Sequence, residues 1–370
     1  MKRLLFILLL IFLGTSCKGQ KQDQTQSLEL ALETFINQEI EKHKIPSLAV
    51  GIVQNGEVVM AKGYGFADVE KKSPATEHTI YQIGSVSKMF TGHVLARLLL
   101  KKEISLDDKV SKFFPEHVNF PLSPSGQSPR IKNIATHSSE FPRYPHNLER
   151  IDPHPIKAYT KEQMYEAIEQ ISIDTLIGSR YNYSNFGYGV LGTAMENLTE
   201  KSLAKLMDEI IFAPYGMKSS SLLPTASIEK KLATPYLAVS PYEQTEPWNM
   251  EALSAAGNVF SSIADLNKFM LELSSNQEVN QVQQSEYFKI NDSWSYGLGC
   301  FIVESKKRET KVIYHGGDID GYASSLSLYP EHKLGIVMLT NWGEGQVIGA
   351  AFDGIYEIIL DYYLGPIQEN

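Results

Sequence analysis

The chain has 370 residues, of which 43% are hydrophobic and 21% are charged, and its formal net charge at pH 7 is −9. This acidic balance, with lysines scattered along the chain, argues against a nucleic-acid-binding protein, because such a protein needs a basic patch to neutralise phosphates. The only two cysteines, Cys17 and Cys300, are too few for a disulfide scaffold.

The N-terminus has the pattern of an export signal. Lys2 and Arg3 precede an apolar run over residues 4–13, which is too short to cross a bilayer core about 30 Å thick. Small residues then lead to Cys17, as in bacterial lipoproteins, whose cysteine is lipidated and becomes the new N-terminus. We expect a signal peptide at residues 1–16, a polar tether at 17–26, and an exported lipoprotein held on the periplasmic or outer-membrane side by Cys17.

The first folded elements are predicted directly after the tether. Residues 28–43 have the spacing of an amphipathic helix. Two β-prone runs follow, at 48–53 and 57–61, joined by Asn55-Gly56, which is a strong hairpin signal. An antiparallel sheet therefore begins here.

A long, mostly buried helix is predicted over residues 84–103, where apolar residues recur at steps of three and four. Ser85 and Lys88 lie one turn apart at its start, so both side chains project from the same face. The lysine becomes a base near pH 7 only if its pKa falls by about three units from about 10.4, which desolvation can achieve. Ser202 and Ser227 head the same Ser-x-x-Lys spacing, so the spacing alone does not choose among the three serines.

Short helices and Pro/Ser-rich loops reach to about residue 275, and the pattern then returns to four β-prone runs, at residues 299–303, 311–314, 323–329 and 334–339. An amphipathic helix at 346–363 follows them. The two strand-rich ends most simply join in one antiparallel sheet, with the helical middle inserted as a second lobe. We expect an α/β fold of the α+β type, with an α/β lobe at 27–83 and 290–365, a helical lobe at 84–289, and a site in the cleft between them.

Two further segments carry groups suited to chemistry. Tyr183 and Asn185 form the only Tyr-x-Asn of the chain, although Asn185 could instead cap the next helix. His315-Gly316-Gly317 follows the predicted strand at 311–314, and its glycines let a substrate or another backbone approach closely. The alternative for this segment is a bulge or turn with an ordinary, partly buried histidine.

In chain order, Ser85-x-x-Lys88, Tyr183-x-Asn185 and His315-x-Gly317 resemble the three motifs of serine β-lactamases and penicillin-binding proteins. The chain is most similar to the class C β-lactamase-related serine hydrolases, a branch with esterases, D-aminopeptidases and D-Ala-D-Ala carboxypeptidases. The likeness extends over residues 27–365 and includes the segments Gly63–Ala67, Leu106–Asp108, Thr136–Ser139, Ala256–Gly257, Tyr296–Gly299 and Leu339–Asn341.

This resemblance selects Ser85 among the three serines and makes Lys333-Leu334-Gly335 a coincidence in a strand turn. It implies acyl transfer through a covalent ester on Ser85, with Lys88 and Tyr183 handling the protons and the division between them left open. It also makes His315 a catalytic residue.

The same resemblance implies which groups bind the substrate. The backbone N–H groups of Ser85 and Asp318 would form the oxyanion hole. Asn185 would hold the substrate amide or the Lys88 side chain, and Gly317 would lie in the binding wall. No cofactor and no metal are implied.

Two departures from the family pattern carry further expectations. His315 stands where many β-lactamases have lysine, so we expect weak or absent β-lactam hydrolysis beside ester or D-amino-acyl peptide cleavage. Ser139-Glu140 stands where relatives tend to have Ser-Gly, which should alter local structure, including the packing of His137.

Several alternatives differ in function. A β-lactamase proper and a non-hydrolytic penicillin-binding or sensor lipoprotein would share this fold. A metal hydrolase is disfavoured because the nine histidines show no His-x-x-x-His, and an α/β-hydrolase because Gly-x-Ser-x-Gly does not occur. The partner is a small-molecule or peptide substrate of unspecified identity, and the oligomeric state is open.

Overall fold

The computed structural model describes residues 26–149, 156, 158–238, 242–275, 277–343 and 346–367. The predicted signal peptide and Cys17 lie outside these residues. Among the helices in this part of the chain, none is both long and apolar enough to cross a membrane.

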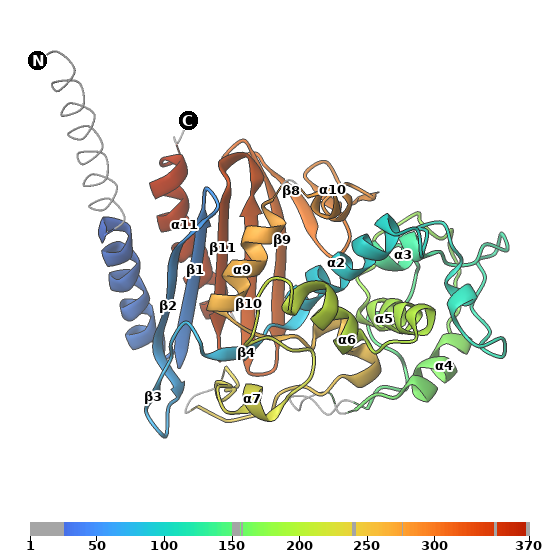
Figure 1. Cartoon of the computed structure of the whole chain (residues 1–370), viewed down its shortest axis with the longest axis horizontal. Coiled ribbons are helices and arrows are strands. Elements are labelled where there is room, and N and C mark those ends of the chain that lie inside the picture. Colours follow the sequence, from blue (N-terminus) through green and yellow to red (C-terminus); the bar gives the residue numbers. More distant parts are fainter. Residues whose placement is uncertain are drawn as a thin grey trace, which may run out of the picture.

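The centre of the fold is a large antiparallel sheet, as the sequence predicted. Within the described residues its strands are β1 (Ser47–Gln54), β2 (Glu57–Asp68), β3 (Ser73–Pro74), β6 (Phe288–Lys289), β7 (Trp294–Tyr296), β8 (Phe301–Ser305), β9 (Thr310–Ile319), β10 (Tyr322–Tyr329) and β11 (Leu334–Thr340). Their order is β3-β2-β1-β11-β10-β9-β8-β7-β6, so the N-terminal strand β1 pairs with the C-terminal strand β11 (Figure 1). This pairing joins the two strand-rich ends of the chain.

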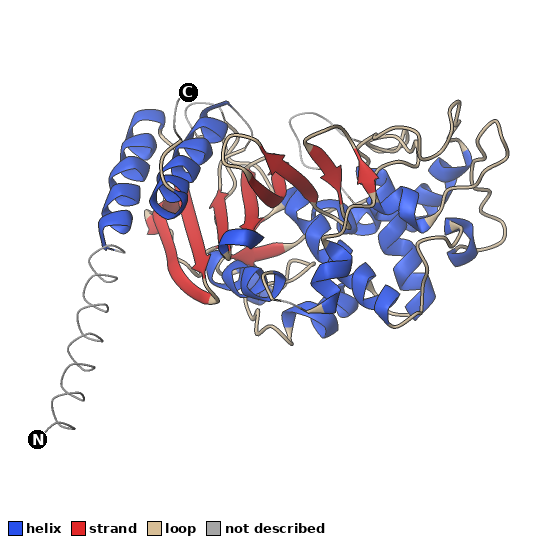
Figure 2. Ribbon diagram, turned by 90° about the horizontal axis from the view of Figure 1, so that it is seen from above, coloured by secondary structure: helices blue, strands red, loops and turns tan. Residues whose placement is uncertain are grey.

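The two faces of the sheet carry different helices. The N-terminal helix, residues 26–43, lies beside α11 (Gln346–Leu364) on one face, and α9 (Ile263–Leu273) packs on β1 and β11 from the other (Figures 1 and 2). Alternation along β1 explains this, because Val50 and Ile52 belong to the core under the terminal helices while Ala49 and Val53 belong to the core on the α9 side. Both faces of the sheet are therefore buried.

Most of the remaining helices gather beyond the β9 side of the sheet (Figure 1). The remaining helices are α2 (Ser87–Leu100), α3 (Ile131–Ala135), α4 (Lys161–Glu169), α5 (Asn185–Thr199), α6 (Leu203–Met207), α7 (Ala226–Glu229), α8 (Ser254–Gly257) and α10 (Glu278–Gln283), with short 3-10 or π turns η1 (Gly84–Val86), η2 (Val110–Phe113), η3 (Asp208–Phe212), η4 (Glu251–Leu253) and η5 (Pro330–His332). Of these, α7 lies below the sheet in the view of Figure 1, and η5 connects β10 to β11. A two-stranded sheet of β4 (Ile80–Gln82) and β5 (Phe260–Ser262) leads into η1. The predicted lobe boundaries stay a prediction. Within the range predicted for the helical lobe, α9 packs on the large sheet and β6 is one of its strands.

The turn chemistry of the first hairpin agrees with the sequence prediction. Asn55 and Gly56 connect β1 to β2 and both have positive φ, 53° and 81°, as a type I′ turn requires. The prediction for His315-Gly316-Gly317 was wrong in one respect: these residues do not follow a strand but lie within β9, where they pair with β10. Pairing with β10, the next strand along the chain, compensates for the low strand propensity of glycine.

The helical segment that carries Ser85 and Lys88 packs closely against the backbone of a neighbouring segment. The predicted helix divides into the 3-10 turn η1, which contains Ser85, and the α-helix α2, which contains Lys88. A Cβ on Gly92 would overlap the carbonyl of Leu298, and one on Gly299, whose φ is +78°, would overlap the carbonyl of Lys88. Glycine at these two positions lets α2 lie directly against the connection between β7 and β8.

The loop after α3 has two left-handed residues that are not glycine, His137 (φ 58°) and Glu140 (φ 67°). The side chain of Glu140 is only 3% exposed, and its Oε2 accepts a hydrogen bond of 2.6 Å from Nε of Arg180. The departure from Ser-Gly thus places a charged side chain where glycine is the unstrained residue, and an ion pair to Arg180 accompanies it.

We expect Glu140→Gly to be more stable than Glu140→Ala by about 1 kcal/mol, because both variants lose the carboxylate but only alanine keeps a Cβ at a left-handed φ. Urea unfolding of the two variants measures the difference. The order should reverse at the exposed strand residue Glu57, where Glu57→Ala should be the more stable variant. Equal stability of the two Glu140 variants would contradict this account of the loop.

Candidate active site

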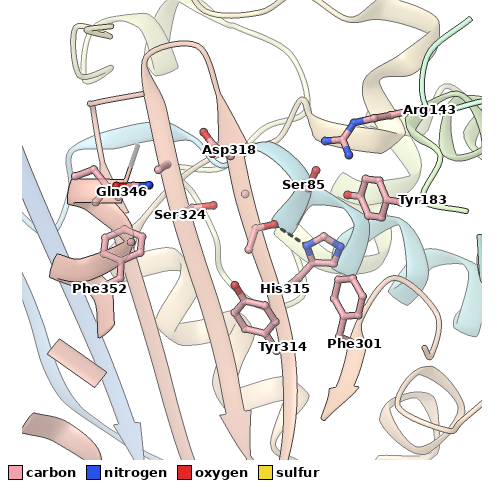
Figure 3. Close-up of a pocket in the computed structure, with 15 residues that line it drawn as sticks. Ser85, Arg143, Tyr183, Phe301, Tyr314, His315, Asp318, Ser324, Gln346 and Phe352 are labelled. Carbon is pink, nitrogen blue, oxygen red and sulfur yellow. Dashed lines mark hydrogen bonds between the residues drawn. The ribbon is translucent and has the colours of Figure 1, made fainter. Parts of the chain in front are cut away.

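A pocket of about 730 Å³ opens between the sheet and the helices (Figure 3). Its lining comes from η1, β8, β9, β10, α11 and two loops of the helical region. The labelled lining residues are Ser85, Arg143, Tyr183, Phe301, Tyr314, His315, Asp318, Ser324, Gln346 and Phe352. Ser85 is partly exposed in this pocket, so its hydroxyl is accessible to a substrate.

Lys88 lies immediately behind Ser85 and is fully buried. Its Nζ is 3.2 Å from Oγ of Ser85, and it donates to Oδ1 of Asn185 and to the carbonyl oxygen of Ala256, both at 2.7 Å. These three oxygens come from η1, α5 and α8, and none of them carries a formal charge. The amine is therefore fixed in position without an anionic partner.

Burial lowers the pKa of Lys88 well below its ordinary value, and the positive charge of Arg143 lowers it further. A neutral amine has two N–H donors and one lone pair. The two acceptors at 2.7 Å, Asn185 Oδ1 and Ala256 O, account for both donors, so the lone pair faces the Ser85 hydroxyl. This is the arrangement that a general base for Ser85 requires.

Tyr183 lies close to both Ser85 and Lys88, in the segment that leads into α5. Its ring centroid lies 4.8 Å from Nζ of Lys88, and its hydroxyl has a hydrogen-bonding interaction with Ser85. Burial raises the pKa of Tyr183 above its ordinary value, while the interaction with Ser85 and the charge of Arg143 oppose that rise. Tyr183 is thus a neutral phenol at pH 7, able to donate a proton beside the nucleophile.

Ser184 and Asn185 take the two roles that the sequence left open for Asn185, which are capping the helix and binding Lys88. The N-cap of α5 is Ser184, whose Oγ accepts from the backbone N–H of Gly187 at 2.7 Å. Asn185 is the first residue of the helix, and its side chain binds Lys88. Of the two roles expected from the family resemblance, the structure shows the contact with Lys88.

Strand β9 runs directly beside η1 and Ser85. A Cβ on Gly317 would overlap the carbonyl of Ile83, so only glycine permits this approach. The backbone nitrogen of Asp318 lies 3.0 Å from the position that a Cβ on Gly84 would occupy, and Oγ of Ser324 on β10 donates to Ile83 O at 2.8 Å. The backbones of Ser85 and Asp318 therefore lie together at one wall of the pocket.

His315 lies in the same wall but is only 2% exposed. Its Nδ1 is 2.7 Å from the carbonyl oxygen of Gly316 (Figure 3). Its Nε2 is 3.3 Å from the hydroxyl of Tyr296. Burial and the charge of Lys88 lower the pKa of His315 to about 3, against the opposing effect of the Gly316 carbonyl. The imidazole is therefore neutral at pH 7, as the sequence led us to expect for this position.

Arg143 is a pocket residue that the sequence reasoning missed. Its side chain is exposed, and its Cζ lies 5.4 Å from the ring centroid of Tyr183. Its backbone carbonyl accepts from the N–H groups of Asn185 and Phe186 at the start of α5. Arg143 thus holds the Tyr183 segment and places a guanidinium at the pocket; no spacing signal in the sequence indicated it.

The other Ser-x-x-Lys pairs lie at the surface. Ser202 is the exposed N-cap of α6 and accepts from the backbone N–H of Lys205. Ser227 is exposed on α7 and bonds to Oγ1 of Thr225. In the described ranges, no group of three or more histidine, cysteine, aspartate or glutamate side chains is placed to hold a metal ion.

Solved structures share this fold. A penicillin-binding protein homologue from Pyrococcus abyssi, described as octameric, superposes with a TM-score of 0.77 at 27% identity, covering 91% of this chain and 77% of its own. A β-lactamase/D-alanine carboxypeptidase from Yersinia pestis gives a TM-score of 0.76 over 90% of this chain and 99% of its own; at 19% identity it shows the fold alone. The predicted fold is confirmed by both.

Curated relatives are similar over most of the chain. Protein flp of Staphylococcus aureus is 26% identical over 328 residues, which are 86% of this chain and 64% of that protein, so the chain spans less than two thirds of its length. The D-alanyl-D-alanine-carboxypeptidase/endopeptidase AmpH of Escherichia coli is 24% identical over 302 residues, 76% of each chain. The sequence model of the Beta-lactamase family matches residues 32–352, and the chain therefore belongs to the Beta-lactamase family.

Proposed function

We propose that this chain is an exported serine hydrolase that forms an acyl-enzyme at Ser85 on an ester, an amide or a D-amino-acyl peptide. The observation that carries the proposal is the buried amine of Lys88, which has two neutral acceptors at 2.7 Å and faces Ser85 Oγ at 3.2 Å. A lysine held in this way is a base matched to a serine nucleophile.

In acylation, Lys88 takes the proton of Ser85 while Oγ attacks the substrate carbonyl. The tetrahedral oxyanion is received by the backbone N–H groups of Ser85 and Asp318, and one such donor is worth about 3–4 kcal/mol. Tyr183 gives its proton to the leaving group as the acyl–leaving-group bond breaks, and regains a proton from Lys88. Water then attacks the ester by the reverse proton path and releases the acid and free Ser85.

The β9 wall favours esters or peptides over β-lactams as substrates. His315 occupies the position of the lysine in many β-lactamases, and its low pKa leaves it without charge at pH 7. A carboxylate in the pocket therefore meets no cation among the residues that β9 contributes to the lining, so β-lactam turnover is weak. The similarity to the carboxypeptidase/endopeptidase AmpH supports a D-amino-acyl peptide, including a peptidoglycan fragment, as a candidate substrate.

We further propose that a lipid on Cys17 anchors the protein to a membrane. Support comes from the cationic start, the short apolar run and the small residues before Cys17, which together have the pattern of a lipoprotein signal. The polar tether would then hold the hydrolase near the membrane surface.

Replacing Ser85 with alanine should abolish labelling by a fluorophosphonate or by fluorescent penicillin, and should lower p-nitrophenyl ester hydrolysis about a thousandfold or more. Gel fluorescence and absorbance measure the two effects. Ser202→Ala is the matched control, because Ser202 heads the same Ser-x-x-Lys spacing at the surface.

Three outcomes would contradict the proposal as stated. Absence of any Ser85-dependent label excludes the enzyme. Labelling by penicillin without hydrolysis of any ester indicates a penicillin-binding sensor. Rapid nitrocefin turnover with no activity on p-nitrophenyl esters indicates a β-lactamase proper.

Lys88→Met should change how stability depends on pH. In the unfolded chain Lys88 has a pKa of about 10.4, whereas in the folded chain its pKa is lower. Between these two pKa values the unfolded state binds one more proton than the folded state, so the wild type loses stability as the pH falls through this range. The unfolding free energy of the variant relative to wild type should therefore rise by as much as about 1.4 kcal/mol per pH unit on going down from pH 10.

Urea unfolding between pH 7 and pH 10 measures this slope. The same substitution at the exposed Lys101 is the control for removing a lysine that the fold does not bury. Parallel stability curves for Lys88→Met and wild type would show that Lys88 carries its proton in the folded protein.

Cys17→Ser should release the protein from the membrane fraction and prevent incorporation of labelled palmitate in a bacterial host. A lipid chain supplies about 0.8 kcal/mol of membrane affinity per buried CH₂, which the serine variant lacks. Cys300→Ser is the matched control, because Cys300 is buried and should keep both the label and the membrane location of the wild type. Palmitate incorporation that survives Cys17→Ser would exclude the anchor.

A further inference from the structure

Three buried side chains, His137, Tyr296 and His315, form a continuous hydrogen-bond chain beneath the pocket. Nδ1 of His137 accepts from the backbone N–H of Ser184 at 3.0 Å, and its Nε2 lies 3.1 Å from the Tyr296 hydroxyl. That hydroxyl lies 3.3 Å from Nε2 of His315, whose Nδ1 lies 2.7 Å from the carbonyl oxygen of Gly316. None of the three side chains is more than 2% exposed.

The two ends of this chain fix the direction of its hydrogen bonds. The backbone N–H of Ser184 can only donate, so Nδ1 of His137 carries no proton and the neutral ring has its proton on Nε2, toward Tyr296. The carbonyl of Gly316 can only accept, so Nδ1 of His315 carries the proton and Nε2 is an acceptor. The Tyr296 hydroxyl therefore accepts from His137, and its single proton is available to Nε2 of His315 and to the hydroxyl of Tyr188, with which it also has a hydrogen-bonding interaction. Neutral imidazoles fit both ends of this chain.

The surroundings of His137 disfavour a positive charge. Four tyrosine rings face it, with centroids 4.4–5.6 Å away: Tyr181, Tyr183, Tyr188 and Tyr296. Burial raises the pKa of each of these phenols, so they supply no anion to an imidazolium. The pKa of His137 is lowered by burial first, and then by electrostatic interactions with Lys88, His315 and Arg143.

His315 has similar neighbours. The ring centroids of Tyr183, Tyr296 and Phe301 lie 6.2 Å, 6.4 Å and 5.3 Å from that of His315. The pKa of His315 is lowered mainly by burial and secondly by its electrostatic interaction with the Lys88 amine. Protonating Nε2 of His315 would place a second N–H donor against the Tyr296 hydroxyl, which already accepts from His137. The hydrogen-bond direction and the electrostatics thus agree on a neutral ring.

We infer that His137 and Tyr296 are positioning residues that hold His315 neutral with its proton on Nδ1, so that His315 orders the β9 wall and neither transfers protons nor binds substrate as a cation. This differs from the sequence expectation that His315 is catalytic. The kinetic part of the inference rests on the proposed function, whereas the state of the histidine rings does not.

The hydrogen-bond chain from His137 to His315 connects two segments of the site, because its two ends contact the backbone of Ser184 and of Gly316. Ser184 lies between Tyr183 and Asn185, and Gly316 lies in β9 next to Gly317. The backbone of His137 adds a second tie, because its carbonyl accepts from the N–H of Asn182 at 2.7 Å. The segment with the proton-donating tyrosine is thereby held at a fixed distance from the strand that faces the substrate.

The ring states can be read directly by long-range ¹H–¹⁵N NMR of the purified wild-type protein labelled with ¹⁵N-histidine. We expect His315 as the Nδ1–H tautomer and His137 as the Nε2–H tautomer, assigned with His315→Gln and His137→Gln, and both unchanged between pH 5 and pH 9. An Nε2–H tautomer for His315, or titration of either ring near pH 6.5, would overturn the inference.

Tyr296→Phe removes the bridging hydroxyl and should shift the Nε2 resonance of His315 to that of an unbonded nitrogen. It should also lower kcat for a p-nitrophenyl ester about tenfold with little change in KM. Tyr181→Phe is the matched control, since the buried Tyr181 hydroxyl lies in the same aromatic cluster and has no hydrogen-bond partner among the described residues. Its kcat and ring states should equal those of wild type.

The two arms separate the failures. If the wild type hydrolyses no ester but shows the expected tautomers, the proposed function fails and the histidine assignment stands. If Tyr296→Phe and Tyr181→Phe lower kcat equally, or if Tyr296→Phe leaves the His315 resonances unchanged, the positioning role of Tyr296 is wrong. The wild-type spectrum decides the ring states even if Tyr296→Phe does not fold.

Discussion

The site depends on one physical constraint, which is the burial of the Lys88 amine among neutral oxygens. No carboxylate in the described part of the chain forms an ion pair with it, and its polar neighbours are a hydroxyl, an amide oxygen and a backbone carbonyl oxygen. Neutral acceptors satisfy the hydrogen bonds of an amine without restoring the solvation that a charged ammonium loses on burial. The fold thereby lowers the pKa of Lys88 and favours the neutral amine over the ammonium ion.

This constraint accounts for the way in which the elements meet. The acceptors Ser85, Asn185 and Ala256 come from η1, α5 and α8, which are far apart in sequence, so these elements must converge on α2. The glycine contacts at Gly92 and Gly299 bring α2 against the connection between β7 and β8. Close packing here fixes the position of Lys88, because a core at native density leaves the side chain little room to move.

The sequence predicted the parts of this site that depend on local chemistry and motif order. Ser85, Lys88 and Tyr183 lie together as the motifs implied, and Asn55-Gly56 forms the predicted hairpin turn. Contacts set by tertiary packing could not be predicted. The carbonyl of Ala256 has no side-chain signature, Arg143 belongs to no recognised spacing, and Ser184 and Asn185 are both good caps, so only the packing of α5 distinguishes their roles.

Histidine in place of lysine on β9 is consistent with the same constraint. A second cation close to Lys88 would repel a proton on either group, and the neutral His315 leaves burial and Arg143 as the main causes of the lowered Lys88 pKa. Arg143 is also the one permanently charged cation among the residues that line the pocket within the described chain. Its guanidinium therefore favours the neutral amine, and in the proposed reaction it would offer a negatively charged substrate group a partner.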